Sequence, residues 1–209
     1  MRPLPRLHAV TDASVLALED FGIRAAAIAS AGPAVALHAR NRSADGAALV
    51  ALTRRLLAHA GPPQASVFVN GRPDIASALD AHGVQLGSED LAPPDARVAA
   101  GAAWDGWVGR SVHDAREAEL AANEGADFLF VGTIFETDSH PGRTPAGPRL
   151  ITESARTGLP VIAIGGVTPA RAREARDAGA YGIAVISAAW RAPDPAAATM
   201  ALLAPWTDE

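Results

Sequence analysis

The fold is decided by the stretch Val161-Ile162-Ala163-Ile164-Gly165-Gly166-Val167-Thr168-Pro169. Its first four residues are apolar and mostly β-branched, which is typical of a buried strand. The two glycines allow a tight turn, and a threonine followed by proline is a common way to begin a helix. Gly179 then supplies the stop for that helix. The stretch therefore predicts one strand–turn–helix unit.

The same pattern recurs along the rest of the chain. Short apolar runs, bounded by Gly, Asp, Asn or Pro, are each followed by a longer Ala-rich segment. Eight runs in 209 residues give a spacing of about 26 residues (209/8), which fits a strand, a loop and a helix. The predicted strands are residues 7–10, 34–37, 66–69, 84–86, 107–108, 128–131, 161–164 and 183–186.

Alternating strands and helices predict a parallel sheet, and eight units close into a barrel. The competing fold is a doubly wound open sheet, which binds its ligand at a glycine-rich turn after the first strand. Here the first strand ends in Val10-Thr11-Asp12, whereas the glycine pair follows the seventh run. We therefore predict an α/β fold, a single (β/α)₈ TIM barrel, with residues 1–209 as one domain.

The composition excludes several classes of function. The formal net charge is −5, and nucleic-acid surfaces need a basic excess, so nucleic acid is not an expected partner. Cysteine is absent, which excludes disulfides and thiolate metal sites. All 18 basic residues are arginine, so no lysine can form a Schiff base. No apolar run approaches the roughly 20 residues that span a bilayer, and we expect a soluble cytoplasmic protein without a membrane partner.

A phosphate site is predicted where the last two strands end. Gly165 and Gly166 let the backbone approach an anion closely, and the helix that follows offers unpaired N–H groups. Ile186 and Ser187 end the eighth strand, and barrels of this kind bind phosphate between strands seven and eight. The alternative is that the glycine pair is only a tight turn. Its position after the seventh strand favours phosphate.

Titratable residues follow other strands. His113 lies just past the fifth strand, where an imidazole can act as both acid and base near neutral pH. Glu89 and Asp90 follow the fourth strand and could hold Mg²⁺, but acids are also favoured in the first turn of a helix, and no metal site is predicted. His38 and His140 lie near the expected barrel mouth with no role assigned.

Five motifs resemble the thiamine phosphate synthase/TenI superfamily, and they cover nearly the whole chain in the expected order. They are Leu7-His8-Ala9-Val10-Thr11-Asp12, Asn70-Gly71-Arg72 with Asp74-Ile75-Ala76, Gly109-Arg110-Ser111-Val112-His113, Phe135-Glu136-Thr137-Asp138 and Pro160-Val161-Ile162-Ala163-Ile164-Gly165-Gly166. The resemblance implies the (β/α)₈ fold independently of the strand count.

The synthases of this superfamily join a pyrimidine pyrophosphate to a thiazole phosphate with Mg²⁺. Their pattern has Asn-Asp after the third strand, an acid after the fourth and two lysines near the pyrophosphate. This chain has Asn70 followed by Gly71, while Asp90 matches the other acid. Arg40 stands where one lysine is expected, and His140 stands near the other. By this comparison the pyrophosphate apparatus is incomplete.

The TenI-like branch carries Asn-Gly-Arg, Gly-Arg-Ser-Val-His and Phe-Glu-Thr-Asp, and this chain has all three motifs. The resemblance therefore implies a thiazole tautomerase, an isomerase of thiamine biosynthesis that aromatises a carboxythiazole phosphate without metal or cofactor. His113 would move the proton, and Gly165, Gly166, Ile186 and Ser187 would hold the phosphate. The expected substrate-binding residues are Arg40, Asn70, Arg72, Ser111, Thr133 and Thr137.

Two other functions stay open. One is a Mg²⁺-dependent thiamine phosphate synthase with altered ligands, and the other is a catalytically silent barrel that binds a phosphorylated ligand. His38 and the Ser139-His140-Pro141 segment depart from the TenI-like pattern, which usually shows basic residues there. The expected partner is a small phosphorylated thiazole, and a homodimer is compatible with this expectation.

Overall fold

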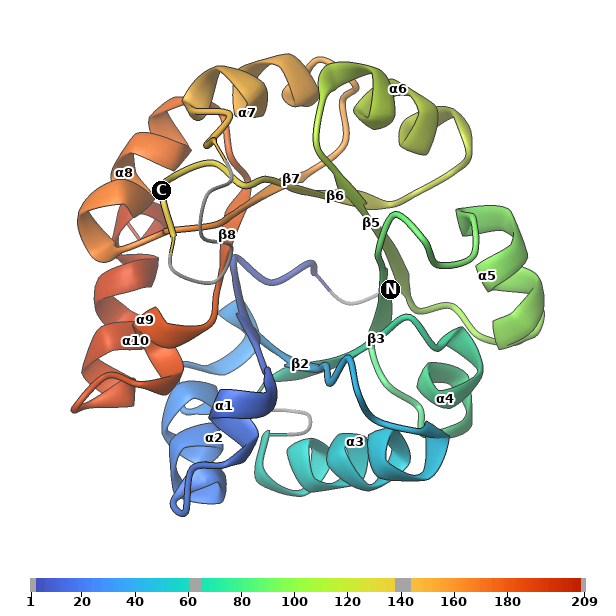
Figure 1. Ribbon diagram of the computed structural model, residues 1–209, viewed down its shortest axis with the longest axis vertical. Helices are drawn as coiled ribbons and strands as arrows, with labels where there is room; N and C mark the ends of the chain where they lie inside the picture. Colours follow the sequence, from blue (N-terminus) through green and yellow to red (C-terminus); the bar gives the residue numbers. More distant parts are fainter. Residues whose placement is uncertain (1–2, 61–64, 138–143, 208–209) are drawn as a thin grey trace.

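Eight parallel strands form a closed barrel, surrounded by a ring of helices (Figure 1). The computed structural model describes residues 3–60, 65–137 and 144–207, so His140 and its neighbours lie outside the described residues. The strands are β1 (Leu7–Val10), β2 (Val35–Ala39), β3 (Ser66–Asn70), β4 (Gly83–Leu86), β5 (Trp107–Val112), β6 (Phe128–Val131), β7 (Val161–Ile164) and β8 (Gly182–Val185).

Helices lie between successive strands and after the last one. They are α1 (Ala13–Leu16), α2 (Phe21–Ala29), η1 (Gly32–Ala34), α3 (Gly46–Ala60), α4 (Pro73–Ala78), α5 (Pro93–Ala100), α6 (Ala115–Asn123), α7 (Pro148–Ala155), α8 (Pro169–Asp177), α9 (Ser187–Trp190), α10 (Pro195–Leu203) and η2 (Ala204–Trp206).

Pairing of the first strand with the last closes the barrel. Leu7 of β1 is in register with Val35 of β2 on one side and with Ile183 of β8 on the other. Each strand pairs in parallel with its neighbours in chain order, which an open doubly wound sheet would not do. The predicted (β/α)₈ barrel is confirmed.

The segment between β1 and β2 forms two helices, α1 and α2, and the short helix η1. The Asp12 side chain accepts from Val15 N and caps a first short helix. A second helix begins at Phe21, whose ring stacks on Trp190 with 5.2 Å between centroids. The chain turns between the two helices, and the second one packs the Phe21 ring against the buried indole.

The apolar core has two layers. One lies between the strands and the helices, and the other fills the barrel itself. The inner layer includes Phe68, Phe128 and Phe130, and Leu4 of the N-terminal segment joins it. The described residues that precede β1 cross the middle of the barrel in the view of Figure 1. Aromatic side chains thus fill the barrel interior, as expected for a packed core.

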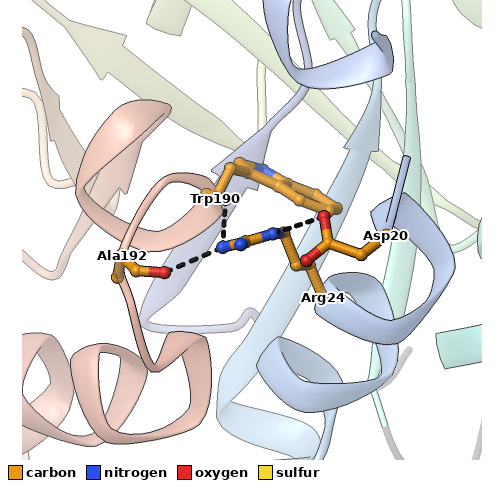
Figure 2. Close-up of polar contacts among 4 residues, drawn as sticks. All are labelled: Asp20, Arg24, Trp190 and Ala192. Atoms are coloured by element: carbon orange, nitrogen blue, oxygen red, sulfur yellow. Dashed lines mark hydrogen bonds and ion pairs between the residues drawn. The ribbon is translucent and has the colours of Figure 1, made fainter. Parts of the chain in front are cut away.

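Arg24 ties the first helical unit to the last (Figure 2). Its Nε donates to Asp20 Oδ1 at 2.8 Å, one turn earlier in α2. Its Nη1 donates to the carbonyl oxygens of Trp190 at 3.1 Å and Ala192 at 2.8 Å. The carbonyls at the end of α9 therefore accept from a charged donor on α2, which joins a helix of the first strand–helix unit to one of the last.

Among the helices in the described part of the chain, none is both long and apolar enough to cross a lipid bilayer.

Candidate functional site

The predicted site residues lie at or after the carboxyl-terminal parts of the strands. Because the eight strands are parallel, these ends meet at one rim of the barrel. Along the rim lie Arg40 after β2, Asn70 at the end of β3, Ser111 in β5, Thr133 after β6, Gly165 and Gly166 after β7, and Ile186 and Ser187 after β8.

The turn after β7 can be built only from glycine. Gly165 and Gly166 have φ of +101° and +63°, where L side chains are strained. A Cβ on Gly166 would lie 2.2 Å from the carbonyl oxygen of Glu136, and one on Gly165 would lie 2.6 Å from Thr133 Cγ2. The segment after β6 therefore packs directly on this turn, and the Arg171 guanidinium holds the Gly166 carbonyl oxygen at 2.8 Å.

The N–H groups open to an anion differ from those that the sequence suggested. Pro169 has no N–H, and Thr168 Oγ1 accepts from Arg171 N at 3.4 Å, so the first turn of α8 is capped. Within the described residues no acceptor is found for the N–H groups of Gly166 and Ser187. These two amides, on neighbouring strand ends, are the donors that a phosphate could use. The phosphate site itself stays a prediction.

His113 is held by two hydrogen bonds. Its backbone N–H donates to Glu117 Oε2 at 2.7 Å, and its ring Nδ1–H donates to the Gly132 carbonyl oxygen at 2.5 Å. Since a carbonyl can only accept, Nδ1 carries the proton and Nε2 of the neutral ring has a free lone pair. The residue also anchors the peptide that precedes Thr133, another predicted site residue.

Arg40 brings a positive charge to the rim. Its backbone N–H donates to Thr11 Oγ1 at 2.9 Å, which joins the ends of β1 and β2. Burial and the positive charge of Arg42 lower the pKa of the Arg40 guanidinium, and Asp12 acts in the opposite direction. Arginine still stays protonated at neutral pH. Within the described residues, the Arg40 guanidinium has no ion pair, so this charge is available to an anionic ligand.

The other predicted substrate-binding residues differ in their exposure and in their contacts. Arg72 is exposed and pairs with Asp74, at 2.8 Å between Nε and Oδ1, so its charge is already matched. Thr133 is buried beside the glycine turn, and Thr137 is half-buried at the end of the described part of its loop. Their substrate contacts stay predictions.

Ser111 is oriented by a neighbour that the sequence did not single out. Gln85 of β4 is buried, and its Nε2 donates to Ser111 Oγ at 3.1 Å and to the Leu86 carbonyl oxygen at 3.2 Å. Because the serine oxygen accepts from Gln85, its own hydroxyl hydrogen points elsewhere and can serve a ligand.

Two buried histidines stand behind Asn70. His38 Nδ1 lies 3.1 Å from the Asn70 amide, His38 Nε2 lies 2.8 Å from His8 Nδ1, and His8 Nε2 lies 3.0 Å from the Pro5 carbonyl oxygen. Burial is the main reason that the pKa of His8 falls well below its ordinary value, and that of His38 falls to about 3. Both rings are therefore neutral at pH 7.

The loop after β4 carries the acid that could meet a metal. Asp90 Oδ2 accepts from Gly87 N at 2.6 Å, and a Cβ on Gly71 would lie 3.1 Å from Asp90 Oδ1. Arg110 of β5 clamps this loop by donating to the carbonyl oxygens of Gly87 at 2.7 Å and Ser88 at 3.1 Å. In the described ranges, no three His, Cys, Asp or Glu side chains gather as a metal cluster.

The family profile and the relatives that are at least 30% identical point to one family. A family profile described as thiamine monophosphate synthase matches residues 7–189. A thiamine-phosphate synthase from Roseiflexus castenholzii is 42% identical over 173 residues, covering 82% of this chain and 75% of the relative. A thiamine-phosphate synthase from Thermus thermophilus is 38% identical over 176 residues, covering 83% of this chain and 84% of the relative. Among solved structures, the thiamine phosphate pyrophosphorylase from Pyrococcus furiosus has a TM-score of 0.77 and 32% identity, covering 96% of this chain and 94% of that chain.

These findings contradict the expected thiazole tautomerase function. The relatives are named as synthases, which are transferases of thiamine biosynthesis, and the isomerase class is not supported. The superfamily prediction holds, whereas the TenI-like branch is not distinguished. The expectation rested on the three TenI-like motifs, and on treating Gly71 and the replaced lysines as disabling for a synthase. Mg²⁺ is commonly held by only one or two carboxylates plus substrate phosphates, so a missing carboxylate does not exclude pyrophosphate chemistry.

Proposed function

Because the chain belongs to the thiamine monophosphate synthase family, we propose that it is a thiamine-phosphate synthase, which joins a pyrimidine pyrophosphate to a thiazole phosphate. The similarity to proteins of that name over most of the chain supports this assignment most directly. The reaction forms a bond between the two heterocycles and releases pyrophosphate.

Two regions of the rim would bind the anionic groups of two phosphorylated substrates. On one side are the N–H groups of Gly166 and Ser187, which would hold the phosphate of the thiazole. On the other are the guanidinium groups of Arg40 and Arg42 at the end of β2, which would hold the pyrophosphate. Neutralising charge on the leaving pyrophosphate is the main demand of the reaction, and fixed cations meet it.

The rim also fits a divalent ion that arrives with its substrate. Asp90 Oδ1 has no hydrogen-bond partner among the described residues, and the missing side chain of Gly71 leaves space beside it. One free carboxylate oxygen suits Mg²⁺, which completes its shell with water and phosphate oxygens. Asp90 would hold the ion, and the ion would add positive charge at the leaving pyrophosphate.

The remaining residues orient the reactants. Ser111, whose oxygen accepts from Gln85, directs its hydroxyl hydrogen to a ligand acceptor. His113 fixes the peptide before Thr133 through the Gly132 carbonyl, and Arg110 holds the loop of Asp90 in place. In this assignment His113 has a structural role, because it holds the peptide before Thr133 in place and transfers no proton.

Genetic complementation tests the proposal in a living cell. A bacterial strain that lacks its own thiamine-phosphate synthase should grow without thiamine when it expresses this chain. An Arg40→Glu variant, which reverses the charge that meets the pyrophosphate, should fail to restore growth at equal protein level. If the unaltered chain accumulates in the cells as folded protein and growth is still absent, the assignment is wrong.

A further inference from the structure

Three hydrogen bonds run in series through the inside of the barrel. They join the Pro5 carbonyl oxygen, His8 of β1, His38 of β2 and Asn70 of β3. Both histidine side chains are fully buried. Phe68 stacks on His38 with 5.1 Å between centroids, and other phenylalanines pack around His8. Within the described residues, His38 is the one hydrogen-bond partner of the Asn70 amide.

The direction of each hydrogen bond follows from the end of the series. The Pro5 carbonyl can only accept, so His8 carries its proton on Nε2. A neutral imidazole has one N–H, so His8 Nδ1 accepts and His38 Nε2–H must be the donor. His38 Nδ1 then has no hydrogen and needs a donor, which only the amide NH₂ of Asn70 can supply.

The argument holds as long as neither ring takes a second proton. Such a proton would place a cation among aromatic side chains, and neither histidine has a carboxylate as hydrogen-bond partner. The positive charge of Arg40, which follows the same strand, opposes protonation of His38. Burying an unpaired charge is costly, so both rings remain neutral.

This result assigns the two ends of the Asn70 amide. Its oxygen and nitrogen are nearly indistinguishable by shape, and hydrogen bonds decide which is which. The structure places Asn70 Oδ1 3.1 Å from His38 Nδ1, but the neutral series requires a donor at that position. The amide is therefore turned over, with Nδ2 toward His38 and Oδ1 at the opposite position. Asn70 is half-buried at the carboxyl end of β3, so its outer amide atom belongs to the rim where the substrates meet.

We propose that His8 and His38 are positioning residues that fix Asn70 with its amide nitrogen toward the barrel interior and its amide oxygen toward the mouth. An amide oxygen accepts hydrogen bonds and binds cations, so the group recognised by Asn70 is an N–H donor or a metal ion and not a phosphate oxygen. The inference deepens the proposed function, on which it depends for the substrates, but the orientation of the amide does not depend on it.

Nuclear magnetic resonance of the whole ¹⁵N-labelled protein tests the orientation directly. At pH 7, His8 and His38 should both show a protonated Nε2 and an unprotonated Nδ1, assigned with His8→Gln and His38→Gln spectra. Scalar coupling across the N–H···N hydrogen bonds should link Asn70 Nδ2 to His38 Nδ1, and His38 Nε2 to His8 Nδ1. A protonated His38 Nδ1, or the absence of the Asn70 coupling, overturns the proposal even if synthase activity is never found.

Kinetics test whether the series acts through Asn70. Removing the partner with His38→Leu should lower kcat/KM for the pyrimidine pyrophosphate about tenfold, the value of one hydrogen bond. His38→Gln, which keeps one donor and one acceptor, should restore most of it. In an Asn70→Ala background, His38→Leu should have no further effect, because the residue it orients is gone. Equal losses in both backgrounds would overturn the proposal.

Phe68→Leu is the matched control for packing. It removes the ring that stacks on His38 but leaves all three hydrogen bonds possible. If the histidines act by hydrogen bonding, this variant keeps the ¹⁵N pattern and kcat/KM within about twofold of the parent, at a cost in stability alone. A tenfold loss in kcat/KM with an intact ¹⁵N pattern would assign the effect of His38 to packing and overturn the proposal.

Discussion

Gly166 occupies a position that excludes every side chain, for two separate reasons. Its φ of +63° is strained for L residues, and a Cβ would meet the backbone oxygen of Glu136 at 2.2 Å. The Glu136 backbone cannot move aside as a flexible side chain could, so any side chain at position 166 would displace the turn. At the scale of the residue, the proposed phosphate site therefore requires a residue without a side chain at position 166.

Gly166→Ala should weaken binding of thiazole phosphate at least about tenfold, because the displaced turn moves its N–H away from the anion. Titration calorimetry with the purified protein measures this. Gly158→Ala is the matched control, since its φ is +79° but a Cβ there meets nothing within 4 Å. It carries the same conformational cost without the collision. Equal affinity of both variants for the phosphate would remove Gly166 from the site.

Asp90 and Glu89 are adjacent acids with different surroundings. Both side chains are exposed, but Asp90 Oδ2 accepts from Gly87 N and the carboxylate lies beside Gly71, whereas Glu89 has no hydrogen-bond partner among the described residues. Asp90→Asn should raise the Mg²⁺ concentration needed for half-maximal activity about tenfold or more, because an amide is a weaker ligand than a carboxylate. Glu89→Gln should leave it unchanged. Activity measured over a range of Mg²⁺ concentrations tests this prediction. The same Mg²⁺ dependence in the Asp90→Asn and Glu89→Gln variants would contradict the role of Asp90.

At the scale of the element, the strand ends were predictable and the links between them were not. Gly165, Gly166, Asn70 and Ser111 could be placed on one rim because parallel strands share a carboxyl end. The support by His8 needed the register between β1 and β2, which no local pattern contains. For the same reason the sequence did not show that Arg110 clamps the loop of Asp90 or that Gln85 orients Ser111.

A single side chain, that of Arg24, connects α2 to the end of α9 through hydrogen bonds to two carbonyl oxygens (Figure 2). Arg24→Gln should lower the free energy of unfolding by about 2 kcal/mol, since hydrogen bonds from a charged group to two carbonyl oxygens are lost. For a protein of this size that is roughly 4–8 °C in Tm. Arg54→Gln, an exposed arginine on α3, should change stability by less than about 0.5 kcal/mol. Thermal and denaturant unfolding measure both, and an Arg24 variant as stable as the Arg54 variant would contradict the account.

At the scale of the whole molecule, the neutral histidines make stability depend on pH. The pKa of His8 and His38 is lower in the folded protein than the ordinary value of 6.5, because both rings are buried. Below pH 6.5 the unfolded chain therefore binds protons that the folded chain does not. The free energy of unfolding therefore decreases as the pH falls below 6.5. Above pH 6.5 the two rings are neutral in both states, and the protein keeps its full stability with respect to them.

Between about pH 6 and pH 4 the slope should approach roughly 1.4 kcal/mol per pH unit for each histidine, or about 2.7 for the pair. Denaturant unfolding at a series of pH values measures it. His38→Gln should reduce the slope by about half, since one of the two titrating rings is gone. A variant with the same slope as the parent would show that these rings do not govern acid unfolding.

Formation of thiamine phosphate is the most direct test of the proposed function. The purified protein is incubated with the pyrimidine pyrophosphate and the thiazole phosphate, and both the thiamine phosphate and the released pyrophosphate are quantified. The account predicts equal amounts of the two products, formed only when both substrates and Mg²⁺ are present and lost on addition of EDTA. Folded protein that binds both substrates yet releases no pyrophosphate in the presence of Mg²⁺ would contradict it.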